Sequence, residues 1–493
     1  MGEETQVQSS EASSAVKVQS AQEEIKLSAV ENSLVANDDI SAVTTSVAVT
    51  NHIDPEPEPT PRSIETAKVA QPVAAAVNVE SNVAPSYVYD AIARIAPQEG
   101  FTPGQFRVTF EVGSAKGDGF VAEMFRARIV EGSREMVILC KIPPTNDVRR
   151  KQFNSMAIFE REVLAYSSLI PTIYEFQRDK GITDEQGVGF FNTPHCYFAY
   201  CDLVAEQSVI AMNDLRLKGY RMWNKMIPVN YEHAKLLMIQ LGRLHAVSFA
   251  LKDQRPEVFE KFKVPDIMTT AFDDSEPFKQ MMFISVDRAL TTLEEHEEKV
   301  RQKVLKMKNT MFEDMVTLTK SEMAEPYAVL GHGDCWINNM MYSYKKGVPT
   351  EVILLDWQIC RYVSPALDLL YFLFCCTDGE FRAAHYDEMI RIYYASLKTL
   401  LEKLGGDPTR QFPYTALLRQ LKQCGKFGLI MAVFLVPMMC IENSDLPDLD
   451  AEAEKFRETQ KVEMPFVVNE KAEAKYRKRM SAVIRDVIRY GYL

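Results

Sequence analysis

A nine-residue stretch at positions 331–339 constrains the fold of this chain more than any other feature. It contains the spacing His-x-Asp-x-x-x-x-Asn, made by His332, Asp334 and Asn339. A short run of β-forming residues precedes the stretch, and a second such run ends at Asp356, seventeen residues after Asn339. The pattern predicts two short strands whose ends bring acidic and amide side chains to one loop.

Side chains of these types, in this order, suit the transfer of a phosphoryl group. The reaction needs positioning and neutralisation of charge more than covalent chemistry from the protein. We expect Asp334 to hold an acceptor hydroxyl and take its proton, and Asn339 and Asp356 to offer oxygen ligands to Mg²⁺. The spacing alone arises by chance in about 5% of chains this long, and the strand-borne Asp356 makes a chance match at least about tenfold rarer. The alternative is that Asp334 and Asn339 cap turns and that His332 is a structural histidine.

The periodicity of apolar residues divides the chain into a β-rich first part and a mostly helical second part. Three strands are predicted at residues 106–112, 121–130 and 135–142, separated by turns that contain glycine. Helices are predicted at residues 153–168, ending at Pro171, at 231–252 after an N-cap at Asn230, at 287–319 as one long helix or a helical pair, and at 470–490. Short β runs at 327–330 and 351–355 interrupt the helical part. We therefore expect an α+β fold.

The first 86 residues differ in composition from the rest of the chain. They contain no Phe, Tyr, Trp or Cys, and residues 1–85 hold 13 acidic against 4 basic side chains, a charge of −9 out of a total of −12. Such a segment buries too little apolar area to offset the entropy of ordering it, so residues 1–86 are predicted to form a disordered acidic tail. The remainder is nearly neutral, which gives no electrostatic reason to expect nucleic acid or an anionic membrane as a partner.

The cysteines and apolar runs indicate a soluble protein in a reducing compartment. All nine cysteines follow residue 139 without a Cys-x-x-Cys pair, which favours reduced thiols over a disulfide framework. The N-terminus has no basic and apolar segments of a secretory signal. The longest apolar run, at residues 427–439, is too short to span a bilayer and contains Pro437. We expect a cytoplasmic location, and the sequence does not identify a protein partner.

Residues 330–341 and 354–358, with the strings His-Gly-Asp-x-Trp-x-Asn-Asn and Asp-x-Gln, resemble the ecdysteroid-kinase-like (CHK-kinase-like) proteins. These proteins are relatives of the choline kinases and aminoglycoside phosphotransferases. Residues 365–372 match the next block of the family, and the resemblance extends over residues 106–493. It implies a protein-kinase-like bilobal fold that uses ATP and Mg²⁺. The N-terminal nucleotide-binding lobe would comprise residues 87–212, and the helical catalytic and acceptor-binding lobe residues 213–493.

The resemblance also implies roles for residues around the catalytic loop. The equivalent of Asp368 braces this loop in the family fold, and His332 orients it. Gln358, in the Asp-x-Gln string, is expected to support the same loop.

Upstream positions are expected to hold the nucleotide. The glycines of the turn at residues 113–120 let backbone N–H groups approach phosphate oxygens, which points to Ser114, Lys116 and Gly117. Lys141 lies at the end of the third predicted strand, where kinases place the lysine that holds the α- and β-phosphates. Its expected partner is Glu162, within a helix that matches the family, rather than Glu160 on another helix face.

A hinge that binds adenine is expected at residues 209–215. By the resemblance, Met212 and Asp214 would contribute to this contact through the backbone. The family commonly has Glu-Asp-Leu here, whereas this chain has Asn213-Asp214-Leu215. Backbone contacts tolerate the change, but any salt link made by the glutamate is lost.

The acceptor is expected to be a small molecule. Only 12 residues separate Asp356 from Asp368, and no Ala-Pro-Glu block follows, so the peptide-docking segment of protein kinases is missing. The family's characterised activity is phosphorylation of hydroxyls on steroid-type molecules, and detoxification of foreign compounds is also proposed for it. The resemblance therefore implies an ecdysteroid-like or xenobiotic alcohol.

Two alternatives stay open. A choline- or ethanolamine-type kinase would need an aromatic box for the cationic head, to which Trp336, Trp357 and Tyr371 could contribute. A catalytically silent homologue that only binds ATP or a small ligand would require the loss of Lys141, Asp334, Asn339 or Asp356, and the sequence retains all four.

Overall fold

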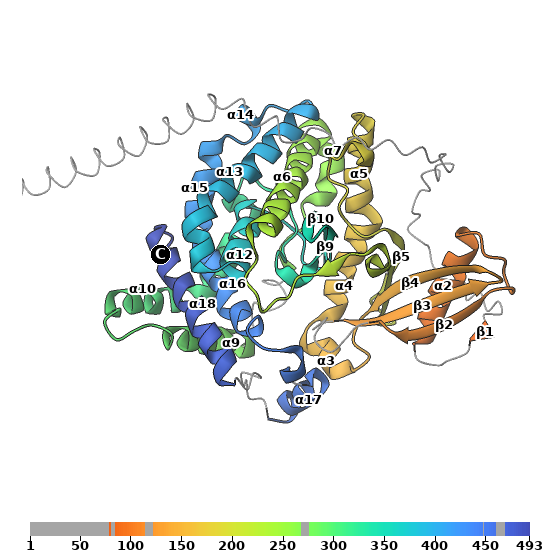
Figure 1. Cartoon of the computed structure of the whole chain (residues 1–493), viewed down its shortest axis with the longest axis horizontal. Coiled ribbons are helices and arrows are strands. Elements are labelled where there is room, and N and C mark those ends of the chain that lie inside the picture. Colours follow the sequence, from red (N-terminus) through yellow and green to blue (C-terminus); the bar gives the residue numbers. More distant parts are fainter. Residues whose placement is uncertain (1–77, 80–83, 114–121, 268–275, 447, 460–468) are drawn as a thin grey trace, which may run out of the picture. The chain divides into compact units, whose positions relative to one another are not determined.

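The N-terminal part of the chain forms a six-stranded sheet in the order β1-β2-β3-β4-β6-β5 (Figure 1). The structure, a computed structural model, describes residues 78–79, 84–113, 122–267, 276–446, 448–459 and 469–493. The strands are β1 (Asn78–Val79), β2 (Arg107–Val112), β3 (Glu123–Glu131), β4 (Arg134–Ile142), β5 (Cys196–Asp202) and β6 (Gln207–Asn213). β1 pairs with β2 in parallel, and the other neighbours in this sheet are antiparallel. The three predicted strands correspond to β2, β3 and β4.

The hairpin between β3 and β4 fixes the position of Lys141. Its two-residue turn consists of Gly132, with a φ of 59°, and Ser133. A tight hairpin turn of this length favours glycine because the backbone must adopt a positive φ. The register that starts with Glu131 opposite Arg134 brings Lys141 opposite Met124, near the far end of β4.

Helix α2 (Ser86–Gln98) packs on the sheet (Figure 1). Its buried side chains Val88, Ile92 and Ile95 share one helix face and join the apolar core under β2, β3 and β4. Burial of each such side chain contributes about 1.5–3 kcal/mol. β1 and the first residue of α2 lie within the range 1–86 that we expect to be disordered. Most of that range lies outside the described residues, so the extent of the tail stays a prediction.

The predicted end of a helix at Pro171 is wrong. Helix α4 (Ser155–Leu164) continues through a π-helical turn, η2 (Ala165–Leu169), into α5 (Ile170–Asp179). Pro171 lies in the first turn of α5, directly after the wider π-helical turn. The N–H that Pro171 lacks therefore falls directly after the π-helical turn, where the regular bonding from residue i to i−4 is already interrupted.

The C-terminal part is mostly helical, as predicted. Its helices are α6 (Tyr231–Gln254), α7 (Pro256–Phe259), α9 (Glu276–Leu290), α10 (Glu298–Lys308), α11 (Met311–Leu318), α12 (Ala366–Cys376), α13 (Gly379–Lys403), α14 (Pro408–Gln411), α15 (Tyr414–Cys424), α16 (Lys426–Met438), α17 (Leu449–Thr459) and α18 (Glu470–Arg489). Asn230 caps α6, since its side chain accepts the N–H of His233. The helix or helical pair predicted at 287–319 is instead the end of α9 followed by α10 and α11. The hydroxyls of Thr291 and Thr292 bond to carbonyls of the last turn of α9 and help to end it.

Two small sheets lie within the helical part and carry the residues predicted to be catalytic. One has the order β10-β9-β7, and the other pairs β11 with β8. Their strands are β7 (Arg221–Met222), β8 (Val329–Gly331), β9 (Met340–Lys345), β10 (Val348–Leu354) and β11 (Arg361–Val363). The predicted β runs correspond to β8 and β10, whereas β7, β9 and β11 were not predicted. All residues of α12 are buried, and its Asp368 contacts the loop that follows β8.

All nine cysteines are free thiols, as predicted. Within the part of the chain that the structure describes, no single helix is both long and apolar enough to cross a membrane. One pair of helices, at residues 408–424 and 426–438 and bent by 55° at its break, passes the same criterion by length and composition.

Candidate active site

A single carboxylate, that of Asp368, holds the backbone of the loop between β8 and β9. Asp368, in the first turn of α12, accepts the backbone N–H groups of His332 at 2.7 Å and Gly333 at 2.9 Å. His245 Nε2 lies 3.3 Å from the same carboxylate, and all of these groups are buried. Burial alone would raise the pKa of Asp368, but the hydrogen bond and charge of His245, the charge of His332 and the N–H of Gly333 together lower the pKa to about 2.

Gly333 allows this loop to run against the segment that follows Trp357. Its φ is +87°, and a Cβ atom there would lie 2.1 Å from the backbone oxygen of Ile359. A side chain at this position is therefore excluded both by the backbone conformation and by the close approach.

Asp334 has a hydrogen-bond donor on each carboxylate oxygen. Asn339 Nδ2 donates to Oδ2 at 2.7 Å, and the hydroxyl of Tyr371 donates to Oδ1 at 2.7 Å. The backbone N–H of Asp334 donates to His332 Nδ1 at 3.3 Å. Burial and the nearby charge of Asp356 raise the pKa of Asp334, while the Tyr371 hydrogen bond opposes the increase.

The β9–β10 hairpin brings Asn339 and Asp356 together. Asn339 directly precedes β9 and Asp356 closely follows β10, and Met340 pairs with Leu354 in the hairpin. The backbone N–H of Leu355 donates to the backbone oxygen of Asn339 at 2.9 Å, which continues the pairing to the residue before Asp356. Asp356 has a φ of 63°, a left-handed conformation that aspartate tolerates better than most residues.

His332 connects the two ends of this arrangement. Its Nε2–H donates to the backbone oxygen of Leu355 at 2.8 Å, while Nδ1 accepts the N–H of Asp334. The ring packs edge-on against Trp357 at 4.8 Å between centroids. His332 therefore contacts both the loop at Asp334 and the segment that leads to Asp356.

Lys141 contacts Glu162, its predicted partner, and also Asp356, which the sequence did not pair with it. Its Nζ lies 2.7 Å from Glu162 Oε2 on α4 and 2.6 Å from Asp356 Oδ1. Burial would lower the pKa of Lys141, but the charges of Asp356 and Glu162 outweigh it and raise the pKa, so the amine stays protonated. Glu162 is fully buried, whereas Glu160 is exposed. The structure therefore joins Lys141 to Glu162, the partner that the sequence favours.

The predicted hinge residues are held by arginines that the sequence did not indicate. The Asp214 carboxylate accepts Arg126 Nε and Arg216 Nε, each at 3.0 Å. Arg216 also donates to the backbone oxygen of Gly113, at the start of the predicted glycine turn, at 2.9 Å. Burial would raise the pKa of Asp214, but the hydrogen bonds and charge of Arg216 lower it. Any contact of Asp214 with a nucleotide is therefore left to its backbone, and Met212 lies on β6 nearby.

For four other predicted site residues, the structure shows, within the ranges that it describes, no contact that would support the expected role. Ser114, Lys116 and Gly117 lie outside the described residues. Gln358 is buried near the loop, and its Oε1 has no hydrogen-bond partner among the residues that the structure describes.

The donors at Asn339 and Asp356 fit a magnesium ion. Nδ2 of Asn339 is occupied by Asp334, which leaves the amide oxygen as the atom available to a cation. The Asp356 side chain is 24% exposed and therefore reachable. Within the described ranges, no group of three or more His, Cys, Asp or Glu side chains forms a metal cage. Two oxygen donors suit Mg²⁺, which keeps several waters and binds substrate phosphates rather than a closed protein cage.

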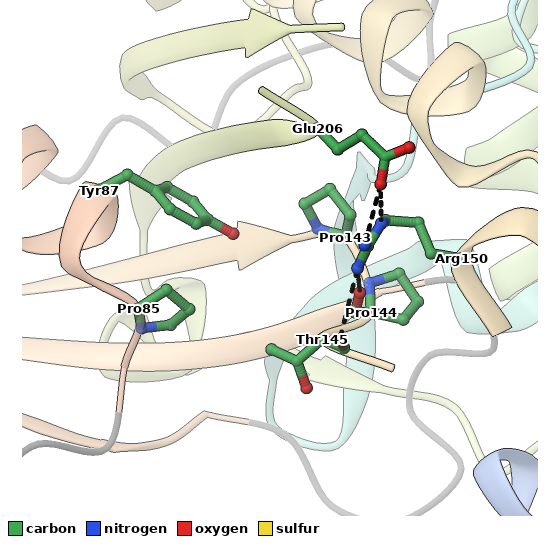
Figure 2. A pocket seen from close by; sticks show the side chains of 7 residues that line it. All are labelled: Pro85, Tyr87, Pro143, Pro144, Thr145, Arg150 and Glu206. Carbon is green, nitrogen blue, oxygen red and sulfur yellow. Dashed lines mark hydrogen bonds and ion pairs between the residues drawn. The ribbon is translucent and has the colours of Figure 1, made fainter. Parts of the chain in front are cut away.

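A separate hollow of about 180 Å³ lies between α2, the end of β4 and the β5–β6 hairpin (Figure 2). It is lined by Pro85, Tyr87, Pro143, Pro144, Thr145, Arg150 and Glu206. Arg150 spans it, donating to Glu206 at 2.9 Å and to the oxygen of Pro144 at 2.8 Å. None of the predicted site residues lines this hollow, and it is smaller than a typical ligand site of roughly 300–1,000 Å³.

Together, these contacts define a protein-kinase-like phosphotransferase: a sheet carries Lys141, a helix supplies Glu162, and a loop bears Asp334 beside Asp356. The sequence model of the ecdysteroid kinase-like family matches residues 116–406, more than half of the chain. The chain belongs to this family, and membership places it among phosphotransferases that act on small molecules.

Solved structures of two small-molecule kinases are similar to the chain. The GDP complex of wild-type aminoglycoside 2'-phosphotransferase-IIIa shares 12% identity over 80% of this chain and 98% of that chain, with a TM-score of 0.36. The Plasmodium vivax ethanolamine kinase shares 14% identity over 76% of this chain and 90% of that chain, also with a TM-score of 0.36. No curated protein matches the chain.

Proposed function

We propose that this protein transfers the γ-phosphate of ATP to a hydroxyl of a neutral small alcohol, an ecdysteroid-like or xenobiotic compound. The observation that carries the proposal is the double contact of Lys141 Nζ, 2.7 Å from Glu162 and 2.6 Å from Asp356. It joins the strand expected to bind ATP phosphates to the carboxylate expected to bind Mg²⁺. The nine free thiols support a reducing compartment such as the cytoplasm.

Each residue then has a distinct task. Lys141, oriented by Glu162, would neutralise the α- and β-phosphates. Asn339 and Asp356 would hold Mg²⁺, which when bound neutralises charge on the phosphate oxygens. Asp334 would orient the acceptor hydroxyl and take its proton as the new oxygen–phosphorus bond forms and the bond from the γ-phosphorus to the ADP oxygen breaks. The contacts described above and the chemistry of the donors support these assignments.

The surroundings of Asp334 favour a neutral acceptor over a cationic one. A choline head would need aromatic faces open to it. Trp357 is fully buried, Trp336 is 8% exposed, and Tyr371 is 2% exposed with its hydroxyl on Asp334. The three aromatic residues that the sequence offered for a cation box therefore present almost no open face in this structure.

The test is an assay of the full chain with labelled ATP and Mg²⁺ against ecdysone, choline, ethanolamine and kanamycin. We expect a labelled phosphate ester of ecdysone and little product from the cations. Asp334→Asn should lower kcat by about 10²–10⁴-fold with little change in ATP affinity, as for a lost general base. Preferred turnover of choline or ethanolamine would support the first alternative. ATP binding without any turnover would support the silent homologue.

A further inference from the structure

We propose that Tyr371 is a positioning residue that fixes the orientation of the Asp334 carboxylate toward the acceptor. The inference rests on the proposed function, since it assumes that Asp334 is the base. Tyr371 donates its hydroxyl hydrogen to Asp334 Oδ1 at 2.7 Å, and nothing in the sequence pattern assigned it to the catalytic loop.

The place of Tyr371 on α12 supports this role. Asp368 and Tyr371 are three residues apart, so they lie on the same face of the helix. Asp368 holds the backbone of the loop at His332 and Gly333, and Tyr371 holds the side chain of the loop at Asp334. One helix face therefore fixes both the path of the loop and the carboxylate that it carries.

The tyrosine ring itself has little freedom. It is 2% exposed and packs edge-on against Phe427 of α16, with 6.4 Å between centroids and 87° between planes. Burial and the charge of Asp334 raise the pKa of Tyr371 well above its usual value, so the phenol keeps its proton and acts as a donor. The hydroxyl is thus presented to Asp334 at a fixed point.

The need for a second contact follows from the rotation of an aspartate side chain. The last torsion of aspartate has broad, roughly two-fold wells, so a carboxylate held at one oxygen can still turn. Asn339 holds Oδ2 and Tyr371 holds Oδ1. Each oxygen keeps a further lone pair, and with both contacts in place those lone pairs have defined directions for the acceptor hydroxyl.

The primary test is Tyr371→Phe, which removes the hydroxyl and keeps the ring. With ecdysone and ATP, or with water as acceptor if ecdysone is not phosphorylated, we expect kcat to fall about 10–100-fold, as for a misoriented reacting group. The KM for ATP and the Tm should stay near wild type. Replacing Tyr371 with 4-aminophenylalanine, which keeps an N–H donor at the same place, should restore much of kcat.

A double mutant separates positioning from general support. In an Asp334→Asn background, Tyr371→Phe should cause little further loss of kcat, because the tyrosine acts through Asp334. The matched control is Tyr394→Phe, which removes a buried hydroxyl that donates to the oxygen of Phe412 and should leave kcat unchanged.

Three results would overturn the inference: an unchanged kcat in Tyr371→Phe, an increased kcat, or an equal further loss in the Asp334→Asn background. Failure of the proposed function has a different signature. If the proposed function is wrong, the Asp334→Asn variant itself would keep the wild-type kcat.

Discussion

Lys141 on β4 and Glu162 on α4 form an ion pair of 2.7 Å, although 21 residues separate them in the chain. Both side chains are at most 8% exposed, and the same ammonium group lies 2.6 Å from Asp356. A buried carboxylate is costly unless a cation accompanies it. Loss of the lysine alone would therefore leave a buried carboxylate without its cation.

Lys141→Met should destabilise the protein by about 3–5 kcal/mol, because Glu162 is left buried without its cation. The double variant Lys141→Met with Glu162→Gln should lose clearly less, since the uncompensated charge is gone. Urea denaturation measures both. As a control, Lys151→Met removes an exposed pair with Asp147 at 3.6 Å and should cost no more than about 0.5 kcal/mol. A double variant as unstable as the single one would contradict this account.

Asp368→Asn should cost about 2–3 kcal/mol near neutral pH. The pKa of Asp368 is lowered to about 2 in the folded state, against about 3.9 in an unfolded chain. The stabilisation is therefore complete above about pH 4 and is lost as the pH falls through about 2. The difference in unfolding free energy between wild type and variant should stay constant from pH 7 to 5 and shrink below pH 4.

A matched control for Asp368 is Asp407→Asn, at the exposed N-cap of α14. Asparagine caps helices about as well as aspartate, so this change should be nearly neutral. If Asp368→Asn is equally neutral at pH 7, the carboxylate does not brace the loop.

Gly333→Ala should impair both stability and turnover. Its positive φ alone costs about 1–2 kcal/mol for alanine, and the new Cβ would collide with the oxygen of Ile359 at 2.1 Å. Relief of that collision displaces the loop beside Asp334, so kcat should fall by about 10²-fold. Gly347→Ala isolates the first effect, since Gly347 has a φ of +81° and open space around its Cβ position. Equal stability and equal kcat in the two variants would disprove the collision.

Removal of residues 1–77 should change the Tm and kcat little, because their composition predicts a disordered tail. Extending the deletion to residue 98 removes α2 and the buried Val88, Ile92 and Ile95. At about 1.5–3 kcal/mol for each buried side chain, this longer deletion should strongly destabilise the sheet. Thermal melting of both truncations gives the comparison. A large drop in Tm for the shorter deletion would show that the tail belongs to the fold.

Local sequence predicted the elements best where the pattern was regular. Strand β3 alternates apolar and polar residues in its middle, β4 is rich in β-forming residues, and a glycine-containing turn joins them; the structure has both strands within two residues of the predicted ends. The helix through Pro171 was missed because local propensity does not reveal a π-helical turn that accommodates the proline. β9 was missed because it is recognisable mainly through its pairing with β10.

The site shows the same division. The sequence revealed the spacing of His332, Asp334 and Asn339, and Asp356 after an apolar strand, because short β-forming runs precede these residues in the chain. The spacing Asp368-x-x-Tyr371 was also present in the sequence. A tyrosine in an apolar helix is, however, assigned to the core unless the structure shows that its hydroxyl contacts Asp334. Arg126 gave no signal, since it meets Asp214, 88 positions away, only after the chain has folded. Arg216 lies two residues after Asp214 and meets it within the local turn η4 (Leu215–Lys218), but it was not recognised from the sequence.

By itself, the sequence determined the chemical groups of this protein, their order, the family and the division into β-rich and helical parts. Only the tertiary structure decided which groups meet: Lys141 with both Glu162 and Asp356, and Tyr371 with Asp334. The physical reason is the range of the interactions. Strand and helix propensities act over a few neighbouring residues, whereas an ion pair or a hydrogen bond between residues 37 or 215 positions apart exists only after sheets and helices have packed.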